Sequence, residues 1–289
     1  MTNDVNDGKV ENIQRIAFVS TAGVAFGMRT IDGKIRTAVT PYGYDVAEGN
    51  IANHNDFFRI GFVGLLPNTS WDMWGPGGNY VYPPSTGIGF RALSASTLDV
   101  SSNGTGIKTV TVDYLDTNYI ARSTTLTLTT AVATAESSAK DAMRFNSLRA
   151  NTVGTLGKAA GAVSIVATSA STDIYRQIAS NETRGRSIIF TVPEGQTLYI
   201  TDISGGIGTN QYNKYVRAKL VANWDGVDES TKTFFTPLWE QLIQGTPYQE
   251  RFDIPLKFPE HTDIKMVLLS NESSGILVNA SIRGWIETP

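Results

Sequence analysis

The chain has 289 residues, of which 41% are hydrophobic and 18% charged, and its formal net charge is −3. The absence of cysteine excludes thiol catalysis, cysteine zinc sites and disulfides, and the weak negative charge provides no overall basic field for nucleic acid. Only His54 and His261 could serve a catalytic triad or a histidine metal site. A chain rich in Thr, Ser, Asn, Gly and aromatic residues is expected to be mainly β rather than coiled-coil or disordered.

The N-terminal residues 1–15 are polar and lack the basic and apolar regions of a secretion signal, so we expect a flexible arm. In residues 16–40, Asp32-Gly33 separates two segments of strand composition, which predicts a β-hairpin. No apolar run approaches the length of about 18 residues that a membrane-spanning helix needs, so no membrane partner is expected.

Residues 41–90 combine many prolines and glycines with aromatic residues. Proline prevents continuous β-ladders, whereas the aromatic residues indicate packing, so we expect an ordered, irregular excursion with few strands. Its candidate functional residues are Trp71, Trp74, Tyr80 and Tyr82. They form either a core under a long loop folded over a sheet, or an exposed patch for subunit contact or sugar stacking.

The next segment, residues 91–135, has clear strand signals. Thr109–Asp113 and Thr125–Thr129 alternate with period two, which places aliphatic residues on one face and threonines on the other. Residues 136–147 are predicted to form a helical turn or two, and a Gly/Ala-rich loop at 154–162 is predicted to precede a strand. The following segment, low in large aliphatic residues, is the expected domain boundary, near residue 183.

The second half has strand signals at short intervals, with turn residues between them and no amphipathic crossover helices. The predicted strands are 187–192, 197–204, 215–224, 231–236, 249–256, 263–270 and 276–286. This spacing is typical of a sandwich or jelly roll. We therefore predict an all-β protein with little helix and two jelly-roll-like β-sandwich domains, at 16–183 (including the excursion) and 184–289.

Three motifs invite a chemical interpretation. Gly104-Thr105-Gly106 superficially resembles a phosphate loop, but a strand follows where a helix is needed, so a β-turn is favoured. The acids of Asp225–Glu229 lack the ligand pattern of a calcium loop and favour a solvated hairpin tip. Asp113 and Asp116 could be paired for glycoside hydrolysis, although acids in turns are much commoner. We predict no catalytic, cofactor-binding or metal-binding residue.

An ordered series of motifs resembles the structural proteins of tailed-bacteriophage virions. Tyr44–Ile51 is similar to the family's DVA-x-G-N-I pattern, and Trp74–Tyr80 to its WDGGG-x-Y pattern. The other similar segments are 99–112, 114–119, 123–130, 190–199 and 252–265. The chain departs from the pattern at Tyr114, where the family has glycine, and at Gly75–Gly78, in place of its DGG.

The resemblance implies a non-enzymatic virion protein that forms homo-oligomers and decorates or connects capsid, neck or tail components. Its expected partners are its own copies and neighbouring capsid, portal or tail proteins, and no cofactor is expected. An alternative is a tail-spike or fibre-type module that recognises host-surface glycan, with the four aromatic residues as its stacking floor. A glycan-degrading enzyme ranks last, because no carboxylate pair stands out.

Overall fold

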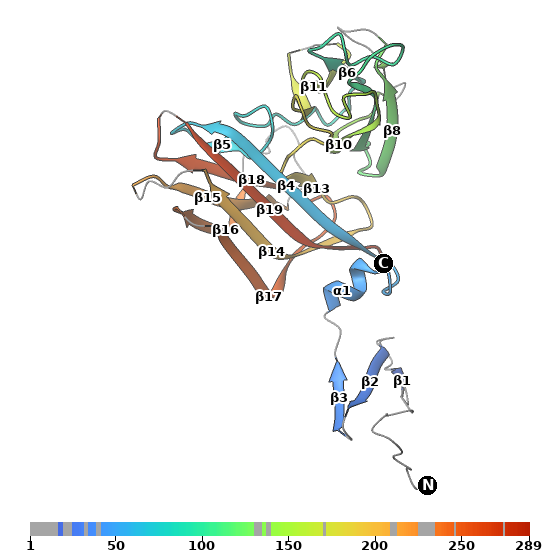
Figure 1. Cartoon of the computed structure of the whole chain (residues 1–289), viewed down its shortest axis with the longest axis vertical. Helices are drawn as coiled ribbons and strands as arrows, with labels where there is room; N and C mark the ends of the chain where they lie inside the picture. Colours follow the sequence, from blue (N-terminus) through green and yellow to red (C-terminus); the bar gives the residue numbers. More distant parts are fainter. Residues whose placement is uncertain are drawn as a thin grey trace. The chain divides into compact units, whose positions relative to one another are not determined.

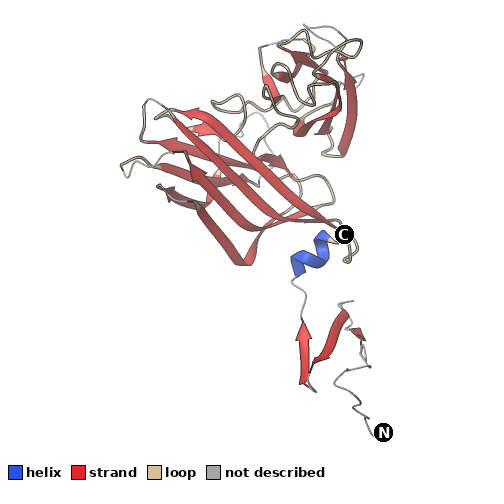
Figure 2. Ribbon diagram, in the orientation of Figure 1, coloured by secondary structure: helices blue, strands red, loops and turns tan. Residues whose placement is uncertain are grey.

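A computed structural model describes most of the chain, which divides into two compact units, Met1–Ala52 and Asn53–Pro289 (Figure 1). The described residues are 17–19, 25–31, 34–38, 42–129, 135–136, 140–169, 172–208, 213–224, 235–245, 247–273 and 275–289. Among them only α1 (Tyr42–Ala47) is an α-helix, so the predicted all-β class is confirmed (Figure 2). None of the described helical structure could span a membrane.

The first unit contains a small antiparallel sheet followed by α1. Its strands are β1 (Ala17–Val19), β2 (Ala25–Ile31) and β3 (Lys34–Ala38). Ile31 pairs with Lys34 across the β2–β3 connection, which confirms the hairpin predicted from Asp32-Gly33. The predicted arm at 1–15 lies outside the described residues.

The second unit contains a large sandwich of two antiparallel sheets. Its strands are β4 (His54–Leu66), β5 (Trp71–Asp72), β13 (Ile189–Thr191), β14 (Thr197–Ile207), β15 (Val216–Asn223), β16 (Thr236–Ile243), β17 (Tyr248–Phe258), β18 (Asp263–Ser270) and β19 (Ile276–Glu287). One sheet has the order β17-β14-β19-β4; in the other, β5 and β13 both pair with β18, which is followed by β15 and β16. β5 and β13 both pair with β18 and together fill one strand position beside it. With the two counted as one strand, the sheet orders are those of a jelly roll.

That shared position is interrupted by a second sandwich. Met73 N–H donates to the carbonyl of Met266 at 2.8 Å, and Ile188 N–H donates to the carbonyl of Met73 at 3.0 Å. The chain therefore leaves the jelly roll at Met73 and returns beside it at Ile188. Residues 74–187 are an insertion within one strand position.

The inserted sandwich has its own sheets and core. Its strands are β6 (Phe90–Ser94), β7 (Ile107–Leu115), β8 (Ala121–Thr127), β9 (Ala135–Glu136), β10 (Arg144–Val153), β11 (Val163–Ala167) and β12 (Ile174–Ile178). They form the sheets β10-β7-β8 and β12-β11-β6-β9. Phe90, Val112, Phe145 and Ile165 lie in its buried core, so the alternation predicted for β7 corresponds to a real buried face.

The interpretation of residues 41–90 as an excursion with few strands is wrong for its middle part. β4 is 13 residues long and pairs with β19 along most of its length, and β5 pairs with β18. Both strands belong to the jelly roll. The reason is visible in the proline positions: none occurs between Pro41 and Pro67, so the segment's average composition concealed a run that can form a continuous ladder.

One local prediction needs correction, and another falls largely outside the described residues. The helical turn at 136–147 is wrong over its described part, because Ala142 bridges to Ile88 and β10 begins at Arg144. The strand predicted at 231–236 lies largely outside the described residues, and β16 instead occupies 236–243. At residues 142–147, tertiary pairing overrides local propensity. The strand predicted at 263–270 is present with those bounds, and the remaining strands predicted in the second half are present with shifted ends.

Candidate functional site

The junction between the two sandwiches is built on a buried ion pair. Arg144 of β10 donates to Asp263 of β18 through Nε at 2.9 Å and Nη2 at 3.2 Å, and Thr191 also donates to Asp263. Arg144 and Asp263 are both buried. Burial alone lowers the pKa of Arg144, but the adjacent Asp263 carboxylate more than offsets this and holds that pKa above its ordinary value.

A second buried arginine, Arg176 of β12, crosses the same junction by donating to carbonyl groups. Its Nε lies 2.7 Å from the carbonyl oxygen of Phe145, and its Nη2 lies 2.7 Å from that of Ile189. Its Nη1 donates to Ser187 Oγ at 2.5 Å. Burial lowers the pKa of Arg176, because desolvation disfavours its charged form.

The junction also contains three of the four aromatic residues predicted as candidates. Trp74 and Tyr80 pack edge-to-face with ring centroids 5.1 Å apart, and Tyr82 packs on Tyr80 at 4.8 Å. Arg144 lies over the Tyr82 ring and Arg176 over the Tyr80 ring. Trp71 is apart from them, packed against the jelly-roll core.

Burial distinguishes the two interpretations of this cluster. Trp74 and Tyr80 are each only 6% exposed, and burial raises the pKa of Tyr80 to about 12. Rings covered in this way have no free face for a sugar, so the core interpretation is favoured for these two residues. Glycan stacking by Trp71 or Tyr82 stays a prediction.

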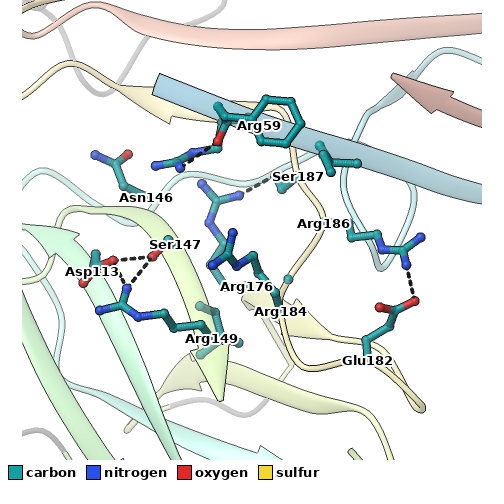
Figure 3. A pocket seen from close by; sticks show the side chains of 14 residues that line it. Arg59, Asp113, Asn146, Ser147, Arg149, Arg176, Glu182, Arg184, Arg186 and Ser187 are labelled. Carbon is teal, nitrogen blue, oxygen red and sulfur yellow. Dashed lines mark hydrogen bonds and ion pairs between the residues drawn. The ribbon is translucent and has the colours of Figure 1, made fainter. Parts of the chain in front are cut away.

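Beside this junction is a pocket of about 300 Å³ (Figure 3). Strand β4 of the jelly roll lines one side, β7, β10 and β12 of the inserted sandwich line another, and residues 182–187 complete it. Its charged lining residues are Arg59, Asp113, Arg149, Arg176, Glu182, Arg184 and Arg186. Five arginines against two carboxylates make it cationic in a chain whose net charge is negative.

Both acids of the pocket are engaged by arginine. Asp113 accepts hydrogen bonds from Ser147 and Arg149, and Glu182 pairs with Arg186 at 2.5 Å. Burial alone would raise the pKa of Asp113, but the hydrogen bonds it accepts lower that pKa below its ordinary value. Within the described part of the chain, Arg59, Arg176 and Arg184 have no carboxylate partner.

Of the three arginines, Arg59 is the one with a buried guanidinium nitrogen that lacks a hydrogen-bond partner. It lies over the rings of Phe57 and Phe190, at 5.1 and 5.2 Å from their centroids, and Nη1 donates to the neighbouring Phe58 carbonyl at 3.2 Å. Its Nε is buried without a hydrogen-bond partner. Burial, together with repulsion from Arg176, lowers the pKa of Arg59 to about 10. An anion in the pocket would favour its charged form.

Asp113 and Asp116, the acids considered for glycoside hydrolysis, lie in environments that do not suit that role. Asp116 accepts from Arg122 Nε at 3.0 Å and from two backbone amides, and these bonds lower its pKa although burial opposes the shift. The pKa of Asp113 is also lowered. A glycosidase general acid requires a raised pKa, so neither carboxyl suits that role. The acids at 225–229 lie outside the described residues.

Sequence reasoning missed a cluster of Glu194, Glu260 and His261, whose potential ligand atoms lie within 4.8 Å of one another. The His261 ring stacks on Tyr119 of the inserted sandwich with centroids 4.0 Å apart. The antiparallel pairing of β13 with β18 brings the two turns together. Because the cluster joins turns far apart in sequence, only that pairing could have revealed it. His54 lies elsewhere, on β4.

Comparisons with solved structures return similarities to virus particles. T=1 particles derived from infectious bursal virus are 11% identical, with 81% of this chain and 69% of the other covered and a TM-score of 0.22. The infectious bursal disease virus Gx strain is 8% identical, with 81% and 71% covered and a TM-score of 0.19. These scores are too low to show a shared fold. No protein-family model or curated protein matches the chain.

Proposed function

We propose that this chain is a non-enzymatic structural protein of a tailed-bacteriophage virion that self-associates on the particle. The ordered motifs that resemble that family support the virion role. The jelly roll is also an architecture that viral capsid domains use, together with lectins and other proteins. Because a fold alone does not define a function, the proposal also depends on surfaces that could join identical copies.

The observation that carries self-association is a hydrophobic projection on β17. Ile200 pairs with Leu256 and Asp202 pairs with Arg251, so the four residues 252–255 lie opposite Thr201 alone. Ile254 in this bulge is 84% exposed, the largest value for a large hydrophobic side chain among the described residues. Bulges at sheet edges redirect side chains, and an exposed apolar side chain there suits a contact with another chain.

The same sheet also offers a hollow that could receive such a projection. An open groove on it is lined by Phe58 and Ile60 of β4, Tyr248 of β17 and small residues of β14 and β19. Ile60 is exposed. An apolar projection and a partly apolar hollow on one chain are the elements of a contact that identical copies can repeat. Such a contact closes into a ring where the rotation permits.

We expect the wild-type protein to form oligomers and Ile254→Asp to dissociate them into smaller species, because the charge would be buried in the contact. Sedimentation velocity over a concentration series measures this. Leu156→Asp, which places the same charge at an exposed leucine of the inserted sandwich, is the matched control and should assemble as the wild type does.

A wild-type protein that stays monomeric at every concentration would contradict the proposed self-association, as would equal dissociation of both variants. The virion role has a separate test. A tag on the chain should be visible by electron microscopy at regular positions on intact phage particles, and particles without the tag would count against the proposal.

A further inference from the structure

We propose that the arginine-lined pocket binds a tetrahedral oxyanion, the phosphate or sulfate group of a small molecule or the free ion. The site adjoins the groove proposed for self-association and shares Phe58 and Ile60 with it, but none of its arginines lines that groove. It is formed where β4 meets the inserted sandwich, so both sandwiches contribute to it.

The first argument is the charge of the lining. The five arginines and two carboxylates give the pocket a formal charge of +3. The two carboxylates are already paired, Asp113 with Arg149 and Glu182 with Arg186. Like charges brought together in a partly buried site destabilise one another, and an anion held among them reverses that effect.

The second argument is the way the unpaired arginines are held. Figure 3 shows Arg176 and Arg184 close together between the two ion pairs, with Arg59 on another side of the pocket. Arg176 is fixed by the carbonyls of Phe145 and Ile189, and Arg59 by the rings of Phe57 and Phe190. Fixing the arginines in advance reduces the entropy that ligand binding must overcome.

The third argument is the match between donors and ligand. A guanidinium presents several N–H groups in a planar fork, which suits the oxygens of phosphate or sulfate. Arg59 Nε is a buried donor without a partner, and Ser187 Oγ is a further polar group of the lining. About 300 Å³ exceeds what a bare ion fills, so there is room for a group esterified to it. Phe58 and Ile60 provide apolar surface for that group.

The test is equilibrium dialysis with radiolabelled inorganic phosphate at low ionic strength, with unlabelled sulfate as competitor. Wild type should retain phosphate, and sulfate should displace it. Arg184→Gln should weaken binding by about tenfold or more, since hydrogen bonds to charged groups are among the stronger ones. Arg184 is exposed, so this variant is expected to fold. Arg184→Lys retains the charge without the fork and should recover part of the affinity.

Arg59→Gln tests the buried wall of the pocket and should weaken binding similarly, with its folding checked by circular dichroism. Arg217→Gln is the matched control, because it removes one positive charge from a surface arginine of β15 outside the pocket. It should bind as the wild type does. No retention of phosphate by the wild type, unchanged binding by Arg184→Gln, or an equal loss in Arg217→Gln would each overturn the proposal.

The source of the anion is resolved by a competition between inorganic phosphate and a sugar phosphate monoester. Tighter binding of the ester would show that its organic group occupies the rest of the pocket. Equal binding would show that the pocket recognises the ion alone. Both results support an oxyanion site. Ile254→Asp should retain full phosphate binding, so failure of this proposal and failure of self-association are distinguishable.

Discussion

Replacement of Asp99 by alanine is expected to destabilise the inserted sandwich by on the order of 4 kcal/mol. The buried Asp99 carboxylate accepts hydrogen bonds from Ile107 N at 2.7 Å, and from Ala160 N and Gly161 N at 2.9 Å each. Ser94 Oγ donates a fourth at 2.7 Å. Alanine would leave one buried and two part-buried backbone amides without this partner, and a fully buried amide left unpaired costs about 1–3 kcal/mol.

Chemical denaturation monitored by circular dichroism measures this loss. Asp99→Asn should have an intermediate stability, because its amide oxygen can replace one acceptor while its NH₂ group faces backbone N–H donors. Asp173→Ala removes an exposed acid of the same inserted sandwich and is the control. A free energy of unfolding for Asp99→Ala equal to that of the control would show that Asp99 does not organise this loop.

The same carboxylate explains the Gly104-Thr105-Gly106 motif. A Cβ on Gly106 would lie 2.0 Å from Asp99 Oδ1, and one on Gly104 would lie 2.3 Å from the carbonyl oxygen of Val100. Both glycines are therefore required by close approach. The preference for a turn over a phosphate loop is confirmed, since β7 begins at Ile107. The backbone amide of Ile107, directly after this turn, donates to the Asp99 carboxylate of the same chain.

Asp263→Ala is expected to cost about 3–5 kcal/mol, because it leaves the Arg144 guanidinium buried without its charge partner. Thr191 would also lose an acceptor. The effect should appear in the midpoint of urea denaturation. Since the ion pair joins β10 to β18, limited proteolysis should in addition cleave the variant faster between the two sandwiches.

The double variant Arg144→Met/Asp263→Leu separates the burial of a lone charge from the contribution of the pair. It should recover much of the lost stability, because apolar residues of similar size often replace a buried ion pair without large cost. Glu240→Ala breaks the exposed pair with Arg217 and should change stability little. A double variant no more stable than Asp263→Ala would contradict this account of the junction.

The fold was predictable where the signal is local. Alternation in 109–113 and the turn residues of the second half led to strands that the structure contains. The insertion was not predictable in this way. β5 has only two residues, and its place in the sheet is set by pairing with β18, nearly 200 positions later. No periodicity can appear in so short a segment.

The candidate site shows the same limit. Arg59, Arg149, Arg176 and Arg184 come from separate segments and have no common spacing, and single arginines in strands are ordinarily interpreted as solvent-facing. The aromatic residues were identified because they are close in sequence. The burial of Trp74, Tyr80 and Tyr82 depends on β10, β12 and β13, which supply the arginines and Ile189 that cover them.

The neighbouring positions of Met73 and Ile188 make the inserted sandwich a cassette. The chain leaves and re-enters the jelly roll at these two residues, both of which bond to Met266 of β18. A change in loop length within the inserted sandwich therefore does not alter the hydrogen bonds of the jelly roll. Turns at the far end of the cassette are free to vary in sequence without altering the ladder that holds it. The architecture thus separates the jelly-roll scaffold from a module whose outer surface can change without disturbing that scaffold.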